Sequence, residues 1–575
     1  MVSATAHVGP PHAAPHRTDA TAWALLAGSV VVHVALACVS GSGPEDHWFG
    51  TCMQAAGEHG VPQVSQHVWW NGPPGYLYVL KAVGTLWTML TGGPLPPDDS
   101  LRVRLLLRLA PTLADLGAAW CLFRIASDAG PRTQALLVLA AYAYNPAVLL
   151  NSAVWGRPES VTSLLLVLAA SLVWRGRPAL GGGIFAGACM TQLHAIAVLP
   201  ALALGVALRA RLPGSFAALR GAGIALLLLL FPFYWVQRGP AVVESLLSPA
   251  SRYAFLSFGA QNLWWLVGSG PASRWTSDAE HIGSALLTYR AVGRILLVTV
   301  TVLVLWRLWR DLQPNPRETP RALCEACALQ LLALYLLPTG TYAHGIVPVL
   351  VFAAAVCVWR RTAWVLYAAV SAGAFVSLLG ARFGTGQPEA TAVSVLFIGV
   401  FVLGLLWTSD RQFAALGSAA ALVVAAAVGG VAALPLPRKQ HLSDWQPVGW
   451  WQDRYEPHSN RSVQGGRLSV GGMIFRHGIG TQTNSQITYD LNGAFTAFDT
   501  LYALDDSSTG APKVQFRILV DGQPRFDSGT VGPGVPPRHA RVSVAGAQVL
   551  TLEVVDGGDG IEGDHADWLE PVLER

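Results

Sequence analysis

The feature that most constrains this chain is a series of long apolar runs. They recur between residues 21 and 434 and are about 17 to 25 residues long, which is the length that an α-helix needs to cross a hydrocarbon core roughly 30 Å thick. Of the 575 residues, 52% are hydrophobic and 13% are charged, whereas soluble proteins have about 25% charged residues. The sequence therefore predicts a polytopic α-helical membrane domain, with the lipid bilayer as its surroundings.

The composition changes after residue 434. Residues 435–442 have the character of a linker, and residues 443–575 are polar and rich in glycine. Apolar side chains alternate with polar ones in two runs, which carry Val514, Phe516, Ile518 and Val520, and Leu550, Leu552 and Val554. A period of two with glycine-containing turns is typical of antiparallel strands. We expect an antiparallel β-sandwich here, and a disordered tail over residues 1–20.

The number of membrane spans has two interpretations. Counting every apolar run gives about thirteen spans, and treating residues 75–92 and 179–208 as re-entrant or broken pieces gives about eleven. Irregular backbone at membrane depth must be buried in protein or line a cavity. We favour the smaller count, which places Glu159 outside and Arg175 and Arg177 inside; the larger count reverses these sides.

The distribution of arginine predicts the orientation. Arg-rich loops alternate with Arg-poor ones in the second half of the helical part, which indicates that the Arg-rich loops are cytoplasmic. The turn from Tyr342 to His344 and the C-terminal domain would then face outside. We expect a multi-pass protein of the cell membrane with an extracytoplasmic C-terminal domain. The arginines concerned are Arg209, Arg211, Arg220, Arg307, Arg310, Arg317, Arg321, Arg360 and Arg361.

Some functions are excluded by composition. The formal net charge of +4 is small, so the chain gives no sign of a nucleic-acid partner. None of its cysteines lies in residues 443–575, so disulfides do not hold that domain together. Cys324 and Cys327 have the spacing of metal ligands but no second pair, and we interpret them as structural.

Two adjacent carboxylates, Glu45 and Asp46, lie in the polar loop after the first apolar run, which ends in a Pro-Pro-Gly turn at Gly75. A loop carboxylate on the outer side could act as general base toward a substrate hydroxyl. The alternative is an ordinary solvated loop.

Three further ionisable residues are candidates for a site. Asp115 lies within a span, where an ionisable residue indicates a functional site; the alternative is an ion pair with Arg104 or Arg108. Glu159 begins a helix, where the helix dipole favours a carboxylate, and this capping role is compatible with a site role. His194, in the broken span, is either a packing residue or part of the site.

Further candidates fall into three groups. Arginine binds phosphate through its fork of donors, so a phosphate site could be held by Arg157, Tyr342 and His344. Sugar-stacking platforms or core residues are Trp445, Trp450, Trp451 and Trp568. Oxygen ligands that could hold a divalent cation such as Ca²⁺ are Asp505, Asp506, Asp559, Asp564 and Asp567.

Several short motifs follow one another in the helical part. They are Asp46-His-Trp-Phe49, Asn71-Gly-Pro-Pro-Gly-Tyr-Leu-Tyr78, Trp155-Gly-Arg-Pro-Glu159 and Ala260-Gln-Asn-Leu-Trp264. Their order resembles that of the GT-C fold glycosyltransferases, in particular bacterial relatives of polyprenol-phosphate-mannose-dependent mannosyltransferases. The resemblance implies that Asp46, with Glu45 beside it, is the catalytic base. It also implies inverting transfer from a polyprenyl-phosphate sugar donor to an extracytoplasmic glycan or lipid-linked acceptor.

The resemblance has four departures. Asn71 replaces the family's Asp, and Glu159 stands for the Asp after Trp-Gly. Gln192-Leu-His194 stands in place of the family's Lys-Pro-Gln, and Thr341-Tyr-Ala-His344 stands in place of Met-His-Glu-Arg. Both usual basic residues are therefore replaced. Trp155, by contrast, lies in a stretch similar to the family's Trp-Gly-Gln-x-Asp, so the resemblance places it at the substrate site.

The C-terminal part resembles the NPCBM carbohydrate-binding module. The motifs that carry this resemblance are Gly478-Ile-Gly-Thr481, Asp505-Asp506 and Asp564-His-Ala-Asp-Trp568. The resemblance implies a jelly-roll-like sandwich with a glycan ligand. Two functions are then open: a membrane glycosyltransferase, or a non-catalytic membrane-anchored glycan-binding protein derived from one.

Overall fold

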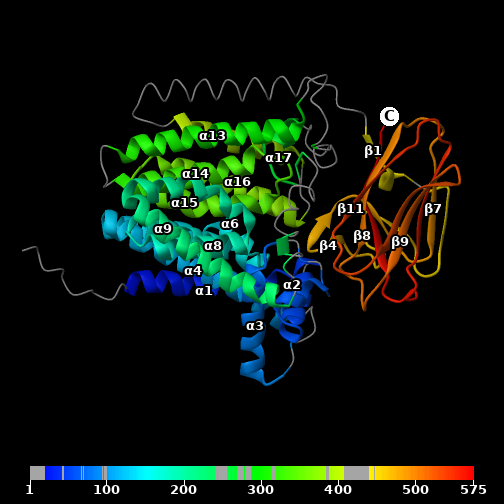
Figure 1. Ribbon diagram of the computed structural model, residues 1–575, viewed down its shortest axis with the longest axis horizontal. Helices are drawn as coiled ribbons and strands as arrows, with labels where there is room; N and C mark the ends of the chain where they lie inside the picture. Colours follow the sequence, from blue (N-terminus) through cyan, green and yellow to red (C-terminus); the bar gives the residue numbers. More distant parts are fainter. Residues whose placement is uncertain are drawn as a thin grey trace, which may run out of the picture.

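The structure is a computed structural model with a helical part and a β domain (Figure 1). It describes residues 20–41, 44–66, 72–93, 100–236, 259–267, 287–313, 318–383, 387–406, 439–445 and 447–574, together with isolated positions between them. The predicted tail, most of the linker and the last predicted span lie outside the described residues, and so does Asn71.

The helical part is a bundle of mostly parallel and antiparallel helices (Figure 1). Within the described residues, six helical stretches are long and apolar enough to cross a membrane, and four shorter ones are apolar too. The predicted α-helical fold is therefore confirmed. The helices are α1 (Ala20–Val39), α2 (Pro44–Glu58), α3 (Gly75–Thr91), α4 (Leu101–Ala129), α5 (Arg132–Ala143), α6 (Pro146–Leu149), α7 (Glu159–Trp174), α8 (Pro178–Thr191), α9 (Leu199–Trp235), α12 (Leu263–Val267), α13 (Tyr289–Leu312), α14 (Thr319–Leu336), α15 (Val347–Val356), α16 (Ala363–Phe383) and α17 (Gln387–Leu406).

The two segments expected to be irregular behave differently. The second is broken as predicted: α8 ends at Thr191, a 3₁₀-helix covers Leu193–Val198, and α9 begins at Leu199. The first, α3, is a continuous helix that runs steeply across the bundle direction (Figure 1). Its first residue, Gly75, lies against the end of α8, where an added Cβ would be 2.4 Å from the Met190 carbonyl oxygen.

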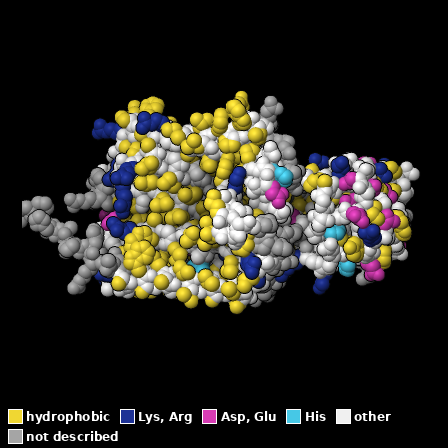
Figure 2. Space-filling view, turned by 90° about the horizontal axis from the view of Figure 1, so that it is seen from below, with side chains coloured by type: hydrophobic (Ala, Val, Ile, Leu, Met, Phe, Trp, Pro, Cys, Tyr) yellow, Lys and Arg dark blue, Asp and Glu magenta, His cyan; other side chains and the backbone are white. Residues whose placement is uncertain are grey.

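The arginine-rich loops share one end of the bundle. Helix α7 starts at Glu159 and α8 returns to Thr191, so the loop with Arg175 and Arg177 lies at the opposite end from these two residues. Glu159 lies 3.7 Å from His344 (Oε1 to Nε2), and this contact puts the turn at His344 at the same end as Glu159. Figure 2 shows Lys and Arg gathered on the helical part away from the β domain. Both span counts put Glu159 and the two arginines on opposite sides. The position of Glu159 at the His344 end agrees with the smaller count.

The β domain consists of two antiparallel sheets and a hairpin. One sheet contains β1 (Lys439–His441), β3 (His458–Ser459), β6 (Gly478–Gln482), β8 (Ala497–Leu504), β11 (Arg538–Ser543) and β13 (His565–Glu574). The other contains β2 (Gly449–Gln452), β7 (Ser485–Asp490), β9 (Val514–Val520), β10 (Gln523–Val531) and β12 (Val549–Asp556). The hairpin is β4 (Leu468–Val470) with β5 (Met473–Phe475).

The core of the β domain lies between its two sheets. The alternating residues of β9 all point into it, as the sequence predicted, and so do those of β12. Trp568 of β13 packs edge-on against Phe516 of β9, with ring centroids 5.1 Å apart. Burial of these apolar side chains is the main force that holds the two sheets together. The predicted antiparallel sandwich is confirmed.

The β4–β5 hairpin contacts the helical part at α2. A Cβ added at Gly472, which has φ +71°, would lie 2.4 Å from the ring of Trp48. Burial and, to a smaller extent, the negative charge of Asp506 raise the pKa of the Cys52 thiol on α2. The hairpin is therefore in close contact with the segment that carries the predicted base.

Candidate active site

A cavity of about 650 Å³ lies where the helical part meets the β domain. Its helical wall comes from α2, from the Trp155 and Gln192 segments and from the turn between α14 and α15. Its other wall comes from the β4–β5 hairpin and neighbouring loops. The cavity size falls in the range of pockets that hold small ligands.

Five of the predicted substrate-binding residues line this cavity: Trp155, Arg157, His194, Tyr342 and His344. They come from three separate segments of the chain. The structure therefore brings together residues that the sequence could only suggest one at a time. Glu159 is fully buried behind them and does not itself line the cavity.

The segment before Trp155 is irregular. Helix α6 is followed by a π-helical turn over Leu150–Val154, and Gly156 continues with φ +69°. π-Helical turns occur frequently at functional sites. This turn interrupts the regular α-helix, and Trp155 and Arg157, which follow it, line the cavity.

A polar cluster forms around Glu159. Gln192 donates from Nε2 to Glu159 Oε1 at 2.8 Å, and Arg157 Nε lies 3.9 Å from Glu159 Oε2. Arg157 Nη2 also lies against His344 Nε2. His344 is flanked by Tyr342, with ring centroids 4.3 Å apart. Glu159 and its neighbours therefore hold Arg157 and His344 in place on the side of these residues that is away from the cavity.

The break between α8 and α9 exposes side chains to the cavity. Gln192 and His194 both lie in it and both line the cavity. Neither ring nitrogen of His194 has a hydrogen-bond partner among the described residues. An irregular segment at this place agrees with the rule that non-helical backbone within a membrane domain lines a cavity.

Asp46 is held behind the cavity wall. Its Oδ2 accepts a hydrogen bond from Arg108 Nη2 at 3.1 Å, and the two side chains are 4% and 2% exposed. Asp46 does not line the cavity, but Trp48 and Phe49 do, and they follow it on the same helix. Glu45 lies on α2 as well, and its side chain is outside the described parts. The structure thus places the predicted base beside the cavity and not in it.

Arg108 has a larger role than the sequence suggested. It donates from Nε to the Ala153 carbonyl at 2.8 Å and from Nη2 to the Val154 carbonyl at 2.7 Å. These bonds satisfy carbonyls at the end of the π-helical turn. Arg108 therefore connects Asp46 to the turn that positions Trp155 and Arg157.

Asp115 belongs to a different buried pair. Its Oδ2 lies 3.5 Å from His33 Nε2 of α1, and both side chains are buried. The ion pair with Arg104 or Arg108 that the sequence suggested is wrong, because Arg108 is directed to Asp46. Asp115 does not line the cavity.

Aromatic rings form one side of the cavity. Trp48 stacks on Trp70 with centroids 5.2 Å apart at 13°, and Phe49 contacts Trp70 edge-on at 6.4 Å. The Arg157 guanidinium lies 5.9 Å from the Phe49 ring centroid. Aromatic faces suit the apolar faces of sugars and can hold a nearby cation.

The β-domain wall carries charge. Arg467 and Arg476 line the cavity, and Glu570 is the one carboxylate among its described lining residues. No pattern in the sequence marks these three residues, because the periodicity of a strand does not say which loop will dock on another domain. The sequence marks a residue as a candidate when it belongs to a motif or lies within a membrane span, and these three residues do neither.

Asp505 and Asp506 hold the hairpin that forms this wall. Asp506 accepts hydrogen bonds from the Gly471 and Gly472 amides at 2.6 and 2.8 Å. Asp505 Oδ2 accepts one from the Ser469 amide at 3.0 Å. Burial, reinforced by the charge of Asp505, raises the pKa of Asp506 to about 6 against these hydrogen bonds. Both carboxylates therefore have structural partners in the hairpin.

The four tryptophans considered as sugar platforms lie in different surroundings. Trp568 is fully buried in the core, so its prediction as a sugar platform is wrong. Trp445 is partly buried and packs on Phe495 at 5.4 Å. Trp450 and Trp451, on strand β2, are 47% and 58% exposed. These two exposed rings stay candidates for a glycan surface.

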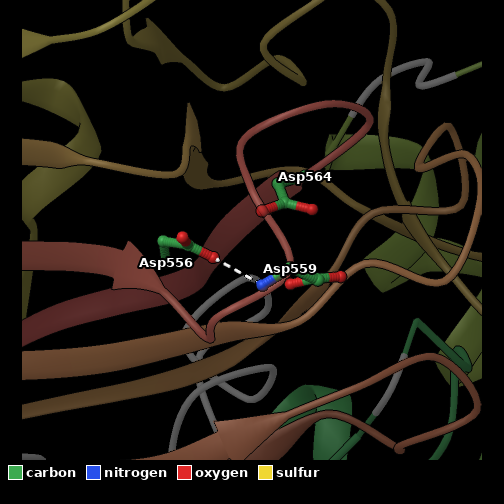
Figure 3. A group of neighbouring side chains, drawn as sticks. All are labelled: Asp556, Asp559 and Asp564. Atoms are coloured by element: carbon green, nitrogen blue, oxygen red, sulfur yellow. Dashed lines mark hydrogen bonds between the residues drawn. The ribbon is translucent and has the colours of Figure 1, made fainter.

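Three carboxylates of the β domain come close enough to hold a cation (Figure 3). One oxygen from each of Asp556, Asp559 and Asp564 lies within 4.8 Å of the others. Asp564 is fully buried; its Oδ2 accepts a hydrogen bond from Thr483, and its Oδ1 has no partner among the described residues. Burial, then the charges of Asp559 and Asp556, raise the pKa of Asp564 to about 6.

Asp567 is separate from this group. It is fully buried, and burial together with nearby Asp505 raises the pKa of its carboxyl group. Of the predicted oxygen ligands, Asp559 and Asp564 come together with Asp556, while Asp505, Asp506 and Asp567 do not join them.

Comparison with known proteins identifies the β domain. Residues 438–574 match the NPCBM/NEW2 domain. The chain is 28% identical over 148 residues to α-1,3-galactosidase B of Akkermansia muciniphila, covering 25% of this chain and 18% of that protein. It is 25% identical over 144 residues to a putative endo-α-N-acetylgalactosaminidase of Renibacterium salmoninarum, covering 24% and 10%. The chain thus spans less than a fifth of either relative.

Solved structures are similar to each part. CBM51 from Clostridium perfringens GH95, in complex with methyl-galactose, has 27% identity and TM-score 0.23 over 24% of this chain and 99% of that one. ArnT from Cupriavidus metallidurans bound to undecaprenyl phosphate has 13% identity and TM-score 0.42 over 72% and 76%. Arabinosyltransferase EmbB from Mycobacterium smegmatis has 14% identity and TM-score 0.32 over 98% and 66%.

Proposed function

We propose that this chain is an integral-membrane glycosyltransferase that transfers a sugar from a polyprenyl-phosphate donor to an extracytoplasmic glycan or lipid-linked acceptor. The observation that carries the proposal is one cavity with two kinds of wall. One wall belongs to an apolar helical bundle and contains Trp155, Arg157 and His344; the other belongs to a domain of a carbohydrate-binding family. A lipid-linked sugar needs both surroundings at once.

The reaction follows from the chemistry of such a donor. The acceptor hydroxyl oxygen forms a bond to the anomeric carbon while the bond from that carbon to the phosphate oxygen breaks. The hydroxyl proton passes to a carboxylate base, and the phosphate leaves with the electron pair. Attack from the face opposite the phosphate inverts the configuration. The protein must supply a base, hold the phosphate charge and exclude water from the anomeric carbon.

Asp46 is the proposed base, with Glu45 next to it in sequence. Asp46 begins the helix whose Trp48 and Phe49 line the cavity. To reach an acceptor, its carboxylate must turn from Arg108 toward the cavity, or the acceptor must bind at the edge near α2. Arg157, His194, Tyr342 and His344 are proposed to bind the donor, with Trp155 packing beside them.

The proposal is tested by sugar transfer in membranes that contain the wild-type chain or Asp46→Asn. Transfer from a polyprenyl-phosphate sugar by the wild type, with a large loss in the variant, is expected. If the wild type transfers no sugar from any common polyprenyl-phosphate donor, the enzyme proposal fails. Transfer undiminished in Asp46→Asn would remove Asp46 as base and leave the enzyme proposal standing.

The second candidate is a non-catalytic membrane-anchored glycan-binding protein. The position of Asp46 in an ion pair, outside the cavity lining, favours it. So do Gln192 and His344 in place of basic residues. Absence of transfer combined with glycan binding through the exposed Trp450 and Trp451 would support this candidate. Loss of glycan binding in Trp451→Ala, with Trp445 left in place, locates that surface.

We also propose an orientation, in which the β domain lies outside the cell. The arginine loops lie at the end of the bundle away from the cavity, and such loops are typically cytoplasmic. The test is labelling of intact cells by a membrane-impermeant maleimide. Gln523→Cys, on the exposed start of β10, is expected to react, and Asp128→Cys, at the arginine end, is not. The reverse pattern would overturn the orientation.

A divalent cation is proposed at Asp556, Asp559 and Asp564. Ca²⁺ prefers carboxylate oxygens as ligands. The buried Asp564 Oδ1 has no hydrogen-bond partner among the described residues, and a bound cation would give it one. Added Ca²⁺ is expected to raise the melting temperature of the chain, and Asp564→Asn is expected to remove that increase. An equal increase in wild type and variant would contradict the site.

A further inference from the structure

The basic side chains of the cavity come from both domains. The helical part supplies Arg157 with the imidazoles of His194 and His344, and the β domain supplies Arg467 and Arg476. Against them stands one carboxylate, Glu570, among the described lining residues. A cavity with several cations and one acid fits a ligand that carries negative charge.

The helical part alone holds few strong phosphate donors. Arg157 is its one arginine among the described lining residues, and that side chain is shared between Glu159 and His344. His194 is half-buried, and burial opposes a positive charge on imidazole. The places where the resemblance would put basic residues hold Gln192 and His344. An anionic ligand therefore needs further donors from somewhere else.

The β4–β5 hairpin and its flanking residues supply two further guanidinium groups to the cavity. Arg467 comes immediately before β4, and Arg476 immediately follows β5. Arg476 forms no ion pair within the part of the chain that the structure describes. The hairpin between them is fixed on one side by Asp506, which binds the Gly471 and Gly472 amides. On the other side it is fixed by the contact of Gly472 with Trp48.

We propose that Arg467 and Arg476 of the carbohydrate-binding domain bind the phosphate of the substrate in the cavity of the helical part, together with Arg157. This inference rests on the proposed function for the identity of the phosphate carrier and on the cavity for the site itself. The guanidinium fork matches phosphate oxygens and keeps its charge at all ordinary pH values. The β domain is then part of the substrate site, in addition to any glycan that it binds at its own surface.

The test measures binding to the full chain in lipid nanodiscs with three probes: undecaprenyl phosphate, undecaprenol and inorganic pyrophosphate. The variants are Arg467→Ala/Arg476→Ala and its conservative form Arg467→Lys/Arg476→Lys. The matched control is Arg525→Ala, which removes an exposed arginine of β10 that does not line the cavity. Circular dichroism and melting temperature show that each variant is folded.

The expected result is a loss of about tenfold or more in affinity for undecaprenyl phosphate in the double alanine variant, because it removes the charge-assisted hydrogen bonds from the two guanidinium groups to the phosphate. The lysine form is expected to recover part of the loss, while Arg525→Ala and the binding of undecaprenol stay unchanged. Equal affinity of wild type and double alanine variant for both phosphate probes would overturn the inference.

The two proposals fail in different ways. If the wild type binds pyrophosphate in a manner that depends on the two arginines but does not bind undecaprenyl phosphate, the anion site stands and the lipid donor is wrong. If the wild type binds undecaprenyl phosphate and the arginines do not matter, the lipid donor stands and the role of the hairpin is wrong. If the wild type binds neither phosphate probe, the arginine site is wrong.

Discussion

The two ends of the helical bundle use arginine in opposite ways. At the end away from the cavity, one buried carboxylate, Glu325, accepts hydrogen bonds from Arg307, Arg321 and Arg360 at 2.5, 2.9 and 2.6 Å. At the cavity end, Arg157, Arg467 and Arg476 line open space with a single carboxylate in the described lining. The difference teaches that the surroundings decide the role: arginines gathered around one buried carboxylate hold helices together, and arginines that line a cavity can reach a ligand there.

The largest effect is expected from Asp46→Asn at the cavity end. Loss of a general base lowers transfer by about 10²–10⁴-fold, measured as sugar transfer per folded molecule. Asp128→Asn is the control at the other end, since it breaks an exposed pair with Arg175 and such pairs contribute at most about 1 kcal/mol. Equal transfer by Asp46→Asn and Asp128→Asn would show that Asp46 has a structural role alone.

Glu325→Gln should separate structure from function at the arginine end. It removes the carboxylate charge that Arg307, Arg321 and Arg360 share, although Arg321 keeps Glu318. We expect the free energy of unfolding to fall by about 3 kcal/mol. The activity of the molecules that remain folded should not change. Thermal unfolding in detergent measures the loss, with Glu318→Gln as control, because Glu318 is more exposed and binds Arg321 alone among the described residues. A stable Glu325→Gln chain with lost activity would contradict the comparison.

Gly472→Ala should weaken the cavity end through its hairpin. The new methyl group would clash with Trp48, and overpacking of this kind usually costs about 1–3 kcal/mol. We expect phosphate binding to fall by about tenfold. Gly510→Ala is the matched control, since Gly510 also has positive φ but has nothing within 4 Å of the added Cβ. If both variants bind phosphate equally, docking of the hairpin on α2 does not matter for the site.

The smallest expected effect is a pH dependence of the hairpin anchor. The pKa of Asp506 is about 6 in the folded chain, above its ordinary value of 3.8. Between about pH 4 and pH 6 the folded state therefore keeps a proton that the unfolded state releases, and the free energy of unfolding contributed by Asp506 falls as pH rises through this window. Above pH 6 the contribution is flat.

The measurement compares urea unfolding of wild type and Asp506→Asn across pH 4–7. The free energy of unfolding of the wild type, relative to that of the variant, should decrease as the pH rises from 4 to 6. An increase over this range would contradict the raised pKa. Asp564, whose pKa is also about 6, has the same sign of effect and is present in both chains, so it cancels from the difference.

Local signals predicted much of this molecule. Apolar runs gave the helices, a period of two gave the inward faces of β9 and β12, and Gln192 and His194 gave the break in the bundle. Arg157 and Tyr342 were candidates because they lie at the edges of loops, and Trp155 because its motif resembles that of the glycosyltransferases. These features depend on the periodicity and length of single elements, which a sequence displays directly.

Features that depend on docking could not be predicted. Arg108 and Asp115 are two helical turns apart on α4, which suggested a pair, but each side chain found a buried partner from another helix. Arg467, Arg476 and Glu570 face the cavity because one loop of a sandwich meets one particular helix. Neither a helical nor a strand period contains that information.

The contact of Gly472 with Trp48 has a consequence for biogenesis. Helix α2 is synthesised before the hairpin, which belongs to a domain that follows the helical part in the sequence. The helical part can insert and pack while one wall of its cavity is still missing. Assembly of the site therefore comes after insertion of the helices, and a chain stopped before the β domain would keep its membrane helices with an open, incomplete cavity.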